Sequence, residues 1–148
     1  MGAKNTAWWN LDRENGNEKA FCCFNSNAQD FARFGKLLLN HGKWNNESLL
    51  DSSYVSEMTT SNGLKEADGT PCIKYGYQWW IIPDFKGHRV VYMRGILGQY
   101  VLIVPDEKMI VVRLGHKRDK PKSSDLYPPD INIYLGAALE MYSNNKKE

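Results

Sequence analysis

The sequence has few cysteines, and their spacing does not suit a metal site or a disulfide framework. Three cysteines occur among 148 residues, with Cys22 and Cys23 adjacent and Cys72 far along the chain. No CxxC pair is present, which excludes a zinc ribbon and a thioredoxin-type redox motif. An odd count argues against a disulfide framework. Because neighbouring cysteines rarely bridge each other, we expect three free thiols.

The chain also lacks long apolar runs and a strong charge of either sign. No run approaches the ~20 residues of a membrane-spanning helix, and residues 1–25 do not match a signal peptide. The formal net charge of +2 is too small to argue for a nucleic-acid or membrane partner. Because His41, His88 and His116 are scattered over predicted loops without ligand spacing, we expect surface histidines and neither metal nor cofactor.

The composition is that of an ordinary folded domain. Hydrophobic residues make up 42% and charged residues 24% of the chain, which suits one domain with a hydrophobic core. The spacing of the apolar residues changes near the middle of the chain, from a helical period to extended runs. We therefore predict a helical and loop part over residues 1–74 and a sheet with a closing helix over residues 75–148.

Three helices are predicted from their starting residues and periodicity. The first runs over about 28–39, where Ser26-Asn27-Ala28-Gln29 fits a capping box with Ser26 as the N-cap and apolar residues recur at helical spacing. Asp51 is an N-cap candidate for a short helix over about 52–60. Asp130 is the candidate for a last helix over about 131–142.

Extended runs fill the second half, where aromatic and β-branched residues dominate. They cover Tyr75–Ile82, Val90–Met93, Tyr100–Val104 and Met109–Leu114. We take Pro83–His88 as a turn after the first run. The short links predict a three-stranded antiparallel meander packed with the C-terminal helix, and so an α+β fold with two further helices before the sheet.

A basic, proline-rich stretch over 116–129 precedes the last helix. It contains Lys117, Arg118, Lys120 and Lys122. A nucleic-acid patch would need aromatic side chains interleaved with these cations, and none is present. We therefore expect a solvated loop and no nucleic-acid partner.

Four segments, in this order over about 100 residues, resemble the β-lactamase-related serine hydrolases. That family includes class C β-lactamases, related esterases, penicillin-binding proteins and 6-aminohexanoate-oligomer hydrolases. Residues 28–39 (AQDFARFGKLLL) resemble the family's ARDxARFGxLxL helix, residues 41–45 (HGKWN) its GxWNG turn, residues 75–80 (YGYQWW) its YGYGWW strand, and residues 94–100 (RGILGQY) its RGxxGQ segment.

The resemblance implies a β-lactamase/transpeptidase-like fold of which this chain is a part. Gly2–Trp8 resembles an LGMxxTxW stretch that lies in mid-protein in full-length members. Residues 1–148 are therefore expected to form a single partial domain, the C-terminal portion of such a hydrolase. Relatives are often periplasmic or secreted, and the sequence leaves the compartment open.

In such enzymes the chemistry needs a serine in an SxxK motif, a YxN or SxN motif, and a strand bearing KTG, HTG or a variant. Only the third motif has a counterpart in this sequence, at Met93-Arg94-Gly95. Met93 replaces the basic residue and Arg94 the threonine, which favours the esterase and amidase branch over β-lactam specificity. The implied substrate-binding residues are Arg94, Gly95, Gly98 and Gln99, and no catalytic residue is assigned.

Each of these residues has a physical reason for its identity. A strand that approaches a substrate cannot carry a Cβ at Gly95, and Gly98 permits a tight turn. Arg94 has two interpretations of equal weight: it binds a substrate carboxylate through a bidentate contact, or it pairs with a structural acid near the sheet edge.

The missing motifs have matches only near the C-terminus. Ser143-Asn144-Asn145-Lys146 fits SxxK, and Tyr142-Ser143-Asn144 fits YxN. We interpret both as coincidence, because a nucleophile needs a fixed rotamer and a neighbouring base, and a charged, frayed terminus offers neither.

Two functional hypotheses follow. The chain is part of a serine hydrolase with an acyl-enzyme mechanism acting on small amides or esters, and is inactive alone. Alternatively, it is a non-catalytic binding or self-association module. In full-length relatives the last strand, here Met109–Leu114, pairs with strands that this chain lacks, so we expect a homodimer through that edge.

Overall fold

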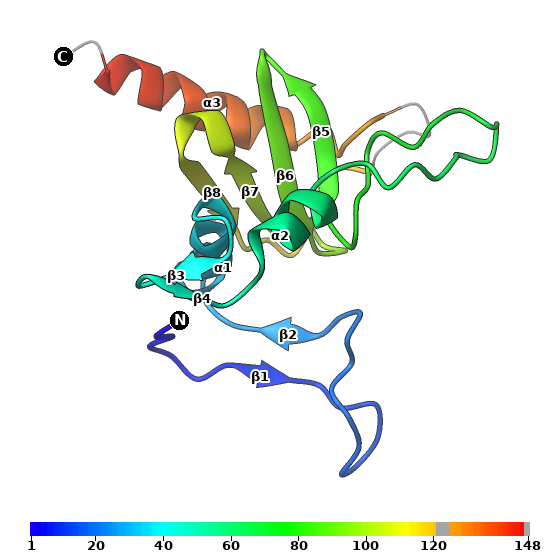
Figure 1. Ribbon diagram of the computed structural model, residues 1–148, viewed down its shortest axis with the longest axis vertical. Helices are drawn as coiled ribbons and strands as arrows, with labels where there is room; N and C mark the ends of the chain where they lie inside the picture. Colours follow the sequence, from blue (N-terminus) through cyan, green and yellow to red (C-terminus); the bar gives the residue numbers. More distant parts are fainter. Residues whose placement is uncertain (121–124, 147–148) are drawn as a thin grey trace.

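The computed structural model describes residues 1–120 and 125–146 (Figure 1). It has the predicted α+β fold. A four-stranded antiparallel sheet has the order β5-β6-β7-β8 and consists of β5 (Trp80–Phe85), β6 (His88–Arg94), β7 (Tyr100–Val104) and β8 (Met109–Arg113). The helices are α1 (Ala28–Leu39), α2 (Ser52–Met58) and α3 (Ile131–Asn145). A short 3-10 helix, η1 (Pro105–Glu107), joins β7 to β8.

Two small hairpins lie before the sheet. The first pairs β1 (Trp8–Trp9) with β2 (Phe24–Asn25), and the second pairs β3 (Lys43–Trp44) with β4 (Glu47–Ser48). Phe24 of β2 stacks edge-on against Phe31 and Phe34 of α1, with ring centroids 5.7 and 6.0 Å apart. These aromatic contacts join the first hairpin to the helix.

The predicted three-stranded meander was wrong by one strand. The first extended run begins and ends later than predicted. Residues 75–79 are irregular apart from one bridge between Tyr75 and Trp80, and β5 runs from Trp80 through Pro83 to Phe85, where a turn was predicted. The pairing of β5 with β6 shifts register between Ile82 and Phe85. Proline cannot donate a ladder hydrogen bond, and it is tolerated here because β5 lies at the sheet edge and the ladder is already interrupted.

Side chains alternate along each strand, so the sheet has two faces. Both faces are apolar, and helices cover both. α3 covers one face, on which Ile82, Val90, Tyr92, Leu102, Ile131 and Leu135 form a core. α1 and α2 cover the other, on which Leu38, Val55, Met58, Ile81, Val91 and Ile103 form a second core. Trp80, the first residue of β5, packs against the first core, and Trp79, which precedes the strand, lies in the second.

The N-terminus of α1 is capped one residue later than predicted. Asn27, not Ser26, is the N-cap, and its side-chain oxygen accepts a hydrogen bond of 3.0 Å from the backbone N–H of Asp30. Asp30 therefore occupies the third helical position, where the prediction put Gln29. The Asn27 side-chain amide also donates to the Asp30 carboxylate at 2.7 Å, so a second bond between the same two residues takes the place of the backbone bond of a capping box.

The other two helices begin at the predicted residues. The Asp51 side chain accepts from the backbone N–H of Ser53, which confirms it as the cap of α2. Asp130 precedes α3 but makes no side-chain cap bond. It is instead buried, and it accepts a hydrogen bond of 3.0 Å from the hydroxyl of Tyr100. α3 runs to Asn145, three residues beyond the predicted end.

The expectation of three free thiols was wrong. Cys22 and Cys23 form a disulfide, and Cys72 is free. Cys23 has a φ of 75°, in the region that L residues rarely adopt. Its carbonyl accepts a hydrogen bond of 3.2 Å from the N–H of Asn10 across the first hairpin. The disulfide therefore lies in an irregular stretch just before β2, which sequence spacing does not predict.

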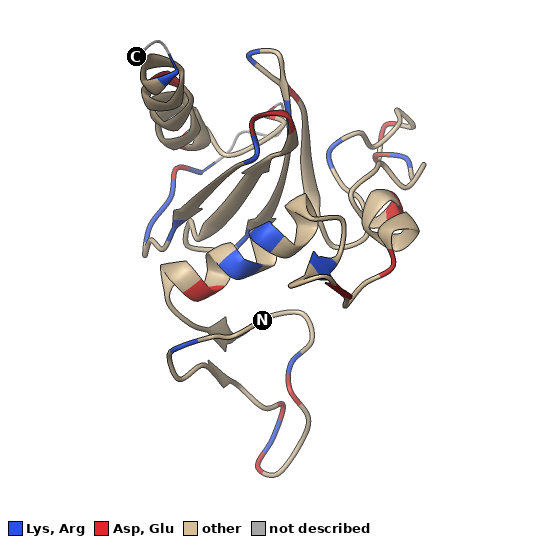
Figure 2. Cartoon of the chain, turned by 60° about the vertical axis from the view of Figure 1, so that its left-hand side comes forward, with Lys and Arg blue, Asp and Glu red and all other residues tan. Residues whose placement is uncertain are grey.

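Charges of both signs are interspersed over the fold (Figure 2), in keeping with the small net charge. Within the described residues, no helix is both long and apolar enough to cross a membrane. Part of the predicted basic loop, residues 121–124 with Lys122, lies outside the residues that the structure describes.

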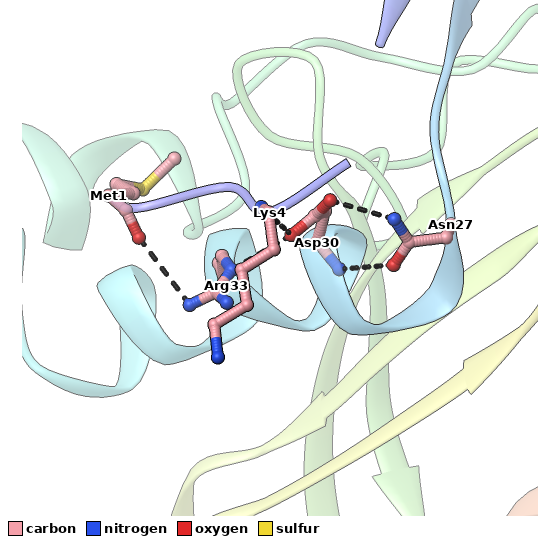
Figure 3. A network of polar contacts seen from close by, with 5 residues as sticks. All are labelled: Met1, Lys4, Asn27, Asp30 and Arg33. Atoms are coloured by element: carbon pink, nitrogen blue, oxygen red, sulfur yellow. Dashed lines mark hydrogen bonds and ion pairs between the residues drawn. The ribbon is translucent and has the colours of Figure 1, made fainter. Parts of the chain in front are cut away.

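One buried carboxylate ties the first residues of the chain to α1 (Figure 3). Asp30 is 4% exposed and accepts hydrogen bonds from the Lys4 backbone N–H at 3.3 Å, from Asn27, and from Nε of Arg33 at 2.9 Å. Arg33 also donates to the Met1 carbonyl. The hydrogen bond from Arg33, with smaller contributions from Asn27 and Lys4, lowers the pKa of Asp30 to about 2.

Because of this network, the free energy of unfolding should change with pH in the acid range. The pKa of Asp30 is lower in the folded than in the unfolded chain, so its contribution is complete above the unfolded pKa near 4 and is lost as pH falls toward 2. We expect Asp30→Asn to lower the urea midpoint at pH 7 and to lose less stability than the parent between pH 4 and 2. Glu14→Gln, in an exposed loop, is the control. An equal loss in the parent and Asp30→Asn would contradict this role.

Candidate functional site

The predicted substrate-binding residues meet in the turn between β6 and β7. The backbone N–H of Gly95 donates to the Gln99 carbonyl at 2.8 Å, and that of Gly98 donates to the Gly95 carbonyl at 3.2 Å. Gly98 has a φ of +85°, which a turn of this kind requires and which glycine adopts without steric cost. The turn is therefore closed by its own backbone.

Gly95 is required by a neighbour within the turn. A Cβ at this position would lie 2.3 Å from Oε1 of Gln99, closer than any real contact. The Gln99 side chain occupies that space because its Oε1 accepts from the Leu97 N–H at 3.2 Å and its Nε2 donates to the Gly115 carbonyl at 2.5 Å. Gln99 thus fastens the turn to the chain that follows β8.

Two arginines that the sequence did not single out brace the same turn. Arg113, at the end of β8, donates to the Gly98 carbonyl and to the Lys117 carbonyl. Arg118 donates through Nε to the Ile96 carbonyl at 2.8 Å. Arg118 was predicted to lie in a solvated loop. The order of the strands could have located both residues, since the chain leaving β8 must pass beside the turn that enters β7.

Arg94 lies at the end of β6 and stacks on an aromatic side chain. Its Cζ is 4.5 Å from the centroid of the Trp80 ring on the neighbouring strand, a cation–π contact. The predicted structural acid is not seen: among the described residues, no ion pair joins Arg94 to a carboxylate. The guanidinium also interacts with the buried Tyr92 hydroxyl, so the ring and the phenol hold it in place without neutralising its charge.

Neutral phenols lie beneath the guanidinium. Tyr92 is fully buried, and burial raises its pKa to about 12, while nearby Arg94 opposes that shift. Tyr100 is also buried, and desolvation together with its hydrogen bond to Asp130 raises its pKa. Both therefore stay protonated at neutral pH and add no negative charge below Arg94.

The outer surface of the turn is apolar and exposed. Ile96 and Leu97 are 81% and 48% exposed. Within the described residues, no group of three His, Cys, Asp or Glu side chains is arranged to hold a metal ion. The turn therefore presents a guanidinium and apolar side chains on its surface.

Solved structures with a similar fold are known. A protein of Bacillus anthracis described as a 6-aminohexanoate-dimer hydrolase is 27% identical, with a TM-score of 0.70 over 95% of this chain and 34% of that one. An octameric penicillin-binding protein homologue from Pyrococcus abyssi is 23% identical, with a TM-score of 0.58 over 90% of this chain and 30% of that one.

The chain has the fold of part of these serine β-lactamase-like proteins, a 6-aminohexanoate-dimer hydrolase and a penicillin-binding protein homologue. It spans about a third of the length of these two structures. No family model matches it, and no curated protein matches it either. The relationship is therefore carried by the fold and by the segments that resemble the superfamily.

The SxxK match at Ser143 is not arranged as a catalytic pair. Ser143 is exposed on α3, and the ammonium of Lys146 instead bonds the Glu107 carboxylate at 2.8 Å. Ser143 lies within α3, which continues through Asn145, and not in the frayed end that was predicted; residues 147–148 lie outside the described part of the chain. Coincidence remains the better interpretation, because a general base must lie within reach of its nucleophile.

The bracing of the turn can be tested with two glycines of equal backbone conformation. Gly98 and Gly69 both have a φ of +85°, but a Cβ at Gly98 would lie 2.2 Å from Nη1 of Arg113, whereas at Gly69 it meets nothing within 4 Å. We expect Gly69→Ala to cost about 1–2 kcal/mol of unfolding free energy. Gly98→Ala should cost about 2 kcal/mol more, because it also displaces the charged hydrogen bond to Arg113.

Chemical denaturation of the two variants measures the difference. Equal losses at the two glycines would show that the arginine contacts do not stabilise the turn.

Proposed function

We propose that this chain supplies a wall of the substrate cleft of a serine hydrolase that acts on small amides or esters through an acyl-enzyme. The observation that carries the proposal is the rigid, exposed turn from Arg94 to Gln99, at the position that resembles the superfamily's KTG strand. A cleft wall must be held by contacts of its own before substrate arrives, and Gln99, Arg113 and Arg118 supply such contacts.

A backbone amide in the turn supports a role in stabilising negative charge. Gly95, Leu97 and Gly98 use their N–H groups within the turn. For the N–H of Ile96, no acceptor is seen in the part of the chain that the structure describes. An amide held rigidly on an exposed turn is suited to donate to a carbonyl oxygen as it becomes an oxyanion.

Arg94 is suited to the part of the substrate that does not react. Its guanidinium stacks on Trp80, and a fixed, planar guanidinium can donate two parallel hydrogen bonds to a carboxylate. We therefore propose a substrate that has two groups. The carbonyl oxygen of its amide or ester accepts a hydrogen bond from the Ile96 N–H, and its carboxylate binds Arg94. The 6-aminohexanoate dimer, named with the Bacillus anthracis relative, has both an amide and a carboxylate.

No serine within these residues is proposed as the nucleophile. The one SxxK match, at Ser143, lies on exposed α3 with its lysine bonded elsewhere. We therefore propose that the chain alone binds such substrates without turning them over.

Tryptophan fluorescence tests the binding role, because Trp80 lies under the guanidinium. We expect titration with the 6-aminohexanoate dimer to change the emission and the dimer methyl ester to bind about tenfold more weakly, since it lacks the charge-assisted contact. Arg94→Gln should weaken dimer binding by the same factor. Arg13→Gln, in an exposed loop, is the control and should bind as the parent does.

Equal affinity for the dimer and its methyl ester would contradict the carboxylate assignment. Hydrolysis of a p-nitrophenyl ester provides the second readout. The parent and Ser143→Ala should both stay at the buffer rate, and turnover that Ser143→Ala abolishes would overturn the proposal.

A second candidate function, self-association, is supported by the sheet edge. β8 pairs with β7 on one side only, and all of its residues are half-exposed. An edge of this kind presents unpaired N–H and C=O groups to another strand. We propose that two copies pair through β8.

Proline substitutions at two adjacent positions separate pairing from folding. Neighbouring N–H groups of a strand point to opposite sides, so of Val111→Pro and Val112→Pro one disrupts the ladder with β7 and the other removes a donor at the free edge. We expect light scattering to show a dimer for the parent and a folded monomer for the edge variant. A monomeric parent at millimolar concentration would contradict the proposal.

A further inference from the structure

A cavity lies on the face of the sheet that α1 and α2 cover. Its volume is about 580 Å³, within the ~300–1,000 Å³ of small-molecule sites. It is lined by side chains of α1, α2, the three strands β5 to β7, and the chain around η1. No function has been assigned above to any of these residues.

The floor of the cavity is apolar. Leu38, Val55, Ile81, Val91 and Ile103 line it, and each is at most 8% exposed. These residues also belong to the core between the sheet and the two helices. The floor is therefore rigid, and a chain of methylene groups would contact it without disturbing the fold.

The side chains at the rim of the cavity are basic. Arg89, Lys108 and His41 line the cavity, and no Asp or Glu is among its lining residues. Arg89 is half-buried and donates through one nitrogen to the Thr59 carbonyl, which fixes its position. Lys108 is exposed beside it, at the end of η1.

The two acids of η1 only partly balance this charge. Asp106 attracts Arg89 but does not come within ion-pair distance of it in the described residues. Glu107 is engaged with Lys146 at 2.8 Å and lies 4.0 Å from Nδ1 of His88. The mouth of the cavity is thus suited to an anion.

This cavity is separate from the turn described above. Arg89 and Arg94 lie at opposite ends of β6, five residues and about 16 Å apart. Their positions differ by an odd number, so they also project to opposite faces of the sheet. A ligand in the cavity would therefore leave the Arg94 turn free.

We propose that this cavity binds an anionic amphiphile, a single carboxylate on an unbranched medium-length alkyl chain. The carboxylate lies between Arg89 and Lys108, and the alkyl chain lies over the floor formed by Val55, Ile81 and Val91. The head is held by charge-assisted hydrogen bonds, and the alkyl chain is held by burial of apolar surface.

Calorimetric titration with decanoate, kept below its micelle concentration, tests the proposal on the whole chain. We expect decanoate to bind and decanol and acetate each to bind at least tenfold more weakly, because one lacks the charge and the other the chain. Shifts of backbone amide signals at Val55 and Ile81, with none at Ile96, should locate the ligand. Equal binding of decanol, or no binding of decanoate, would overturn the proposal.

A matched pair of lysine variants tests the position of the head. Lys108→Gln should weaken decanoate binding about tenfold, whereas Lys43→Gln, at an exposed lysine on β3, should not change it. Thermal unfolding checks that both variants fold, and Lys108→Met, which also removes the charge, is the substitute if Lys108→Gln does not. Unchanged binding in Lys108→Gln would overturn the assignment.

One further comparison distinguishes a free carboxylate from a lipid surface. Monomeric decanoate should bind as well in the absence of membranes as in their presence. Adsorption to phosphatidylglycerol vesicles without binding of monomeric decanoate would show that the cations recognise a surface, and would overturn the proposal.

Discussion

The pairing of β7 with strands on both sides is the constraint on which the rest of the structure depends. Every residue of this strand is buried, because β6 and β8 flank it and helices cover both faces of the sheet. A strand that is apolar on both faces needs both faces covered, and a central position in a sheet between helices provides this. A slip of one residue would move each side chain to the opposite core, so the register is strongly fixed.

That register places the functional turn. Tyr100 at the start of β7 pairs with Arg94 on one side and with Arg113 on the other. Arg94 therefore ends its strand beside the turn, and Arg113 reaches the same turn from β8. Its guanidinium also lies 4.7 Å from the ring of Tyr134 on α3. Strand pairing, the bracing of the turn and the covering helix are thus connected through a few residues.

The two ends of β6 have different surroundings. At one end, Arg94 lies on Trp80 next to exposed apolar residues of the turn. At the other, Arg89 lies at the mouth of a cavity with an apolar floor. Both arginines are fixed by contacts that do not neutralise their charge, an aromatic ring in one case and a backbone carbonyl in the other. One strand therefore presents cations for two separate ligands.

Local features of the sequence determined the helices and the fold class. Asp51 caps its helix because that interaction involves only the next two residues, and the apolar period of α1 predicts its length. The extended runs indicated the strands, and the RGILGQ segment indicated the turn. Each of these predictions rests on neighbours in the sequence, whose spacing the chain itself fixes.

Other features were decided only by the tertiary structure. Pro83 is accepted in β5 because that strand lies at an edge, which a local pattern does not reveal. The Cys22–Cys23 disulfide lies in an irregular stretch just before β2. Gly95 is required by the side chain of Gln99, and Arg118 leaves its basic loop to bond the Ile96 carbonyl. These contacts join residues whose proximity arises only when the strands pair, so sequence spacing could not predict them.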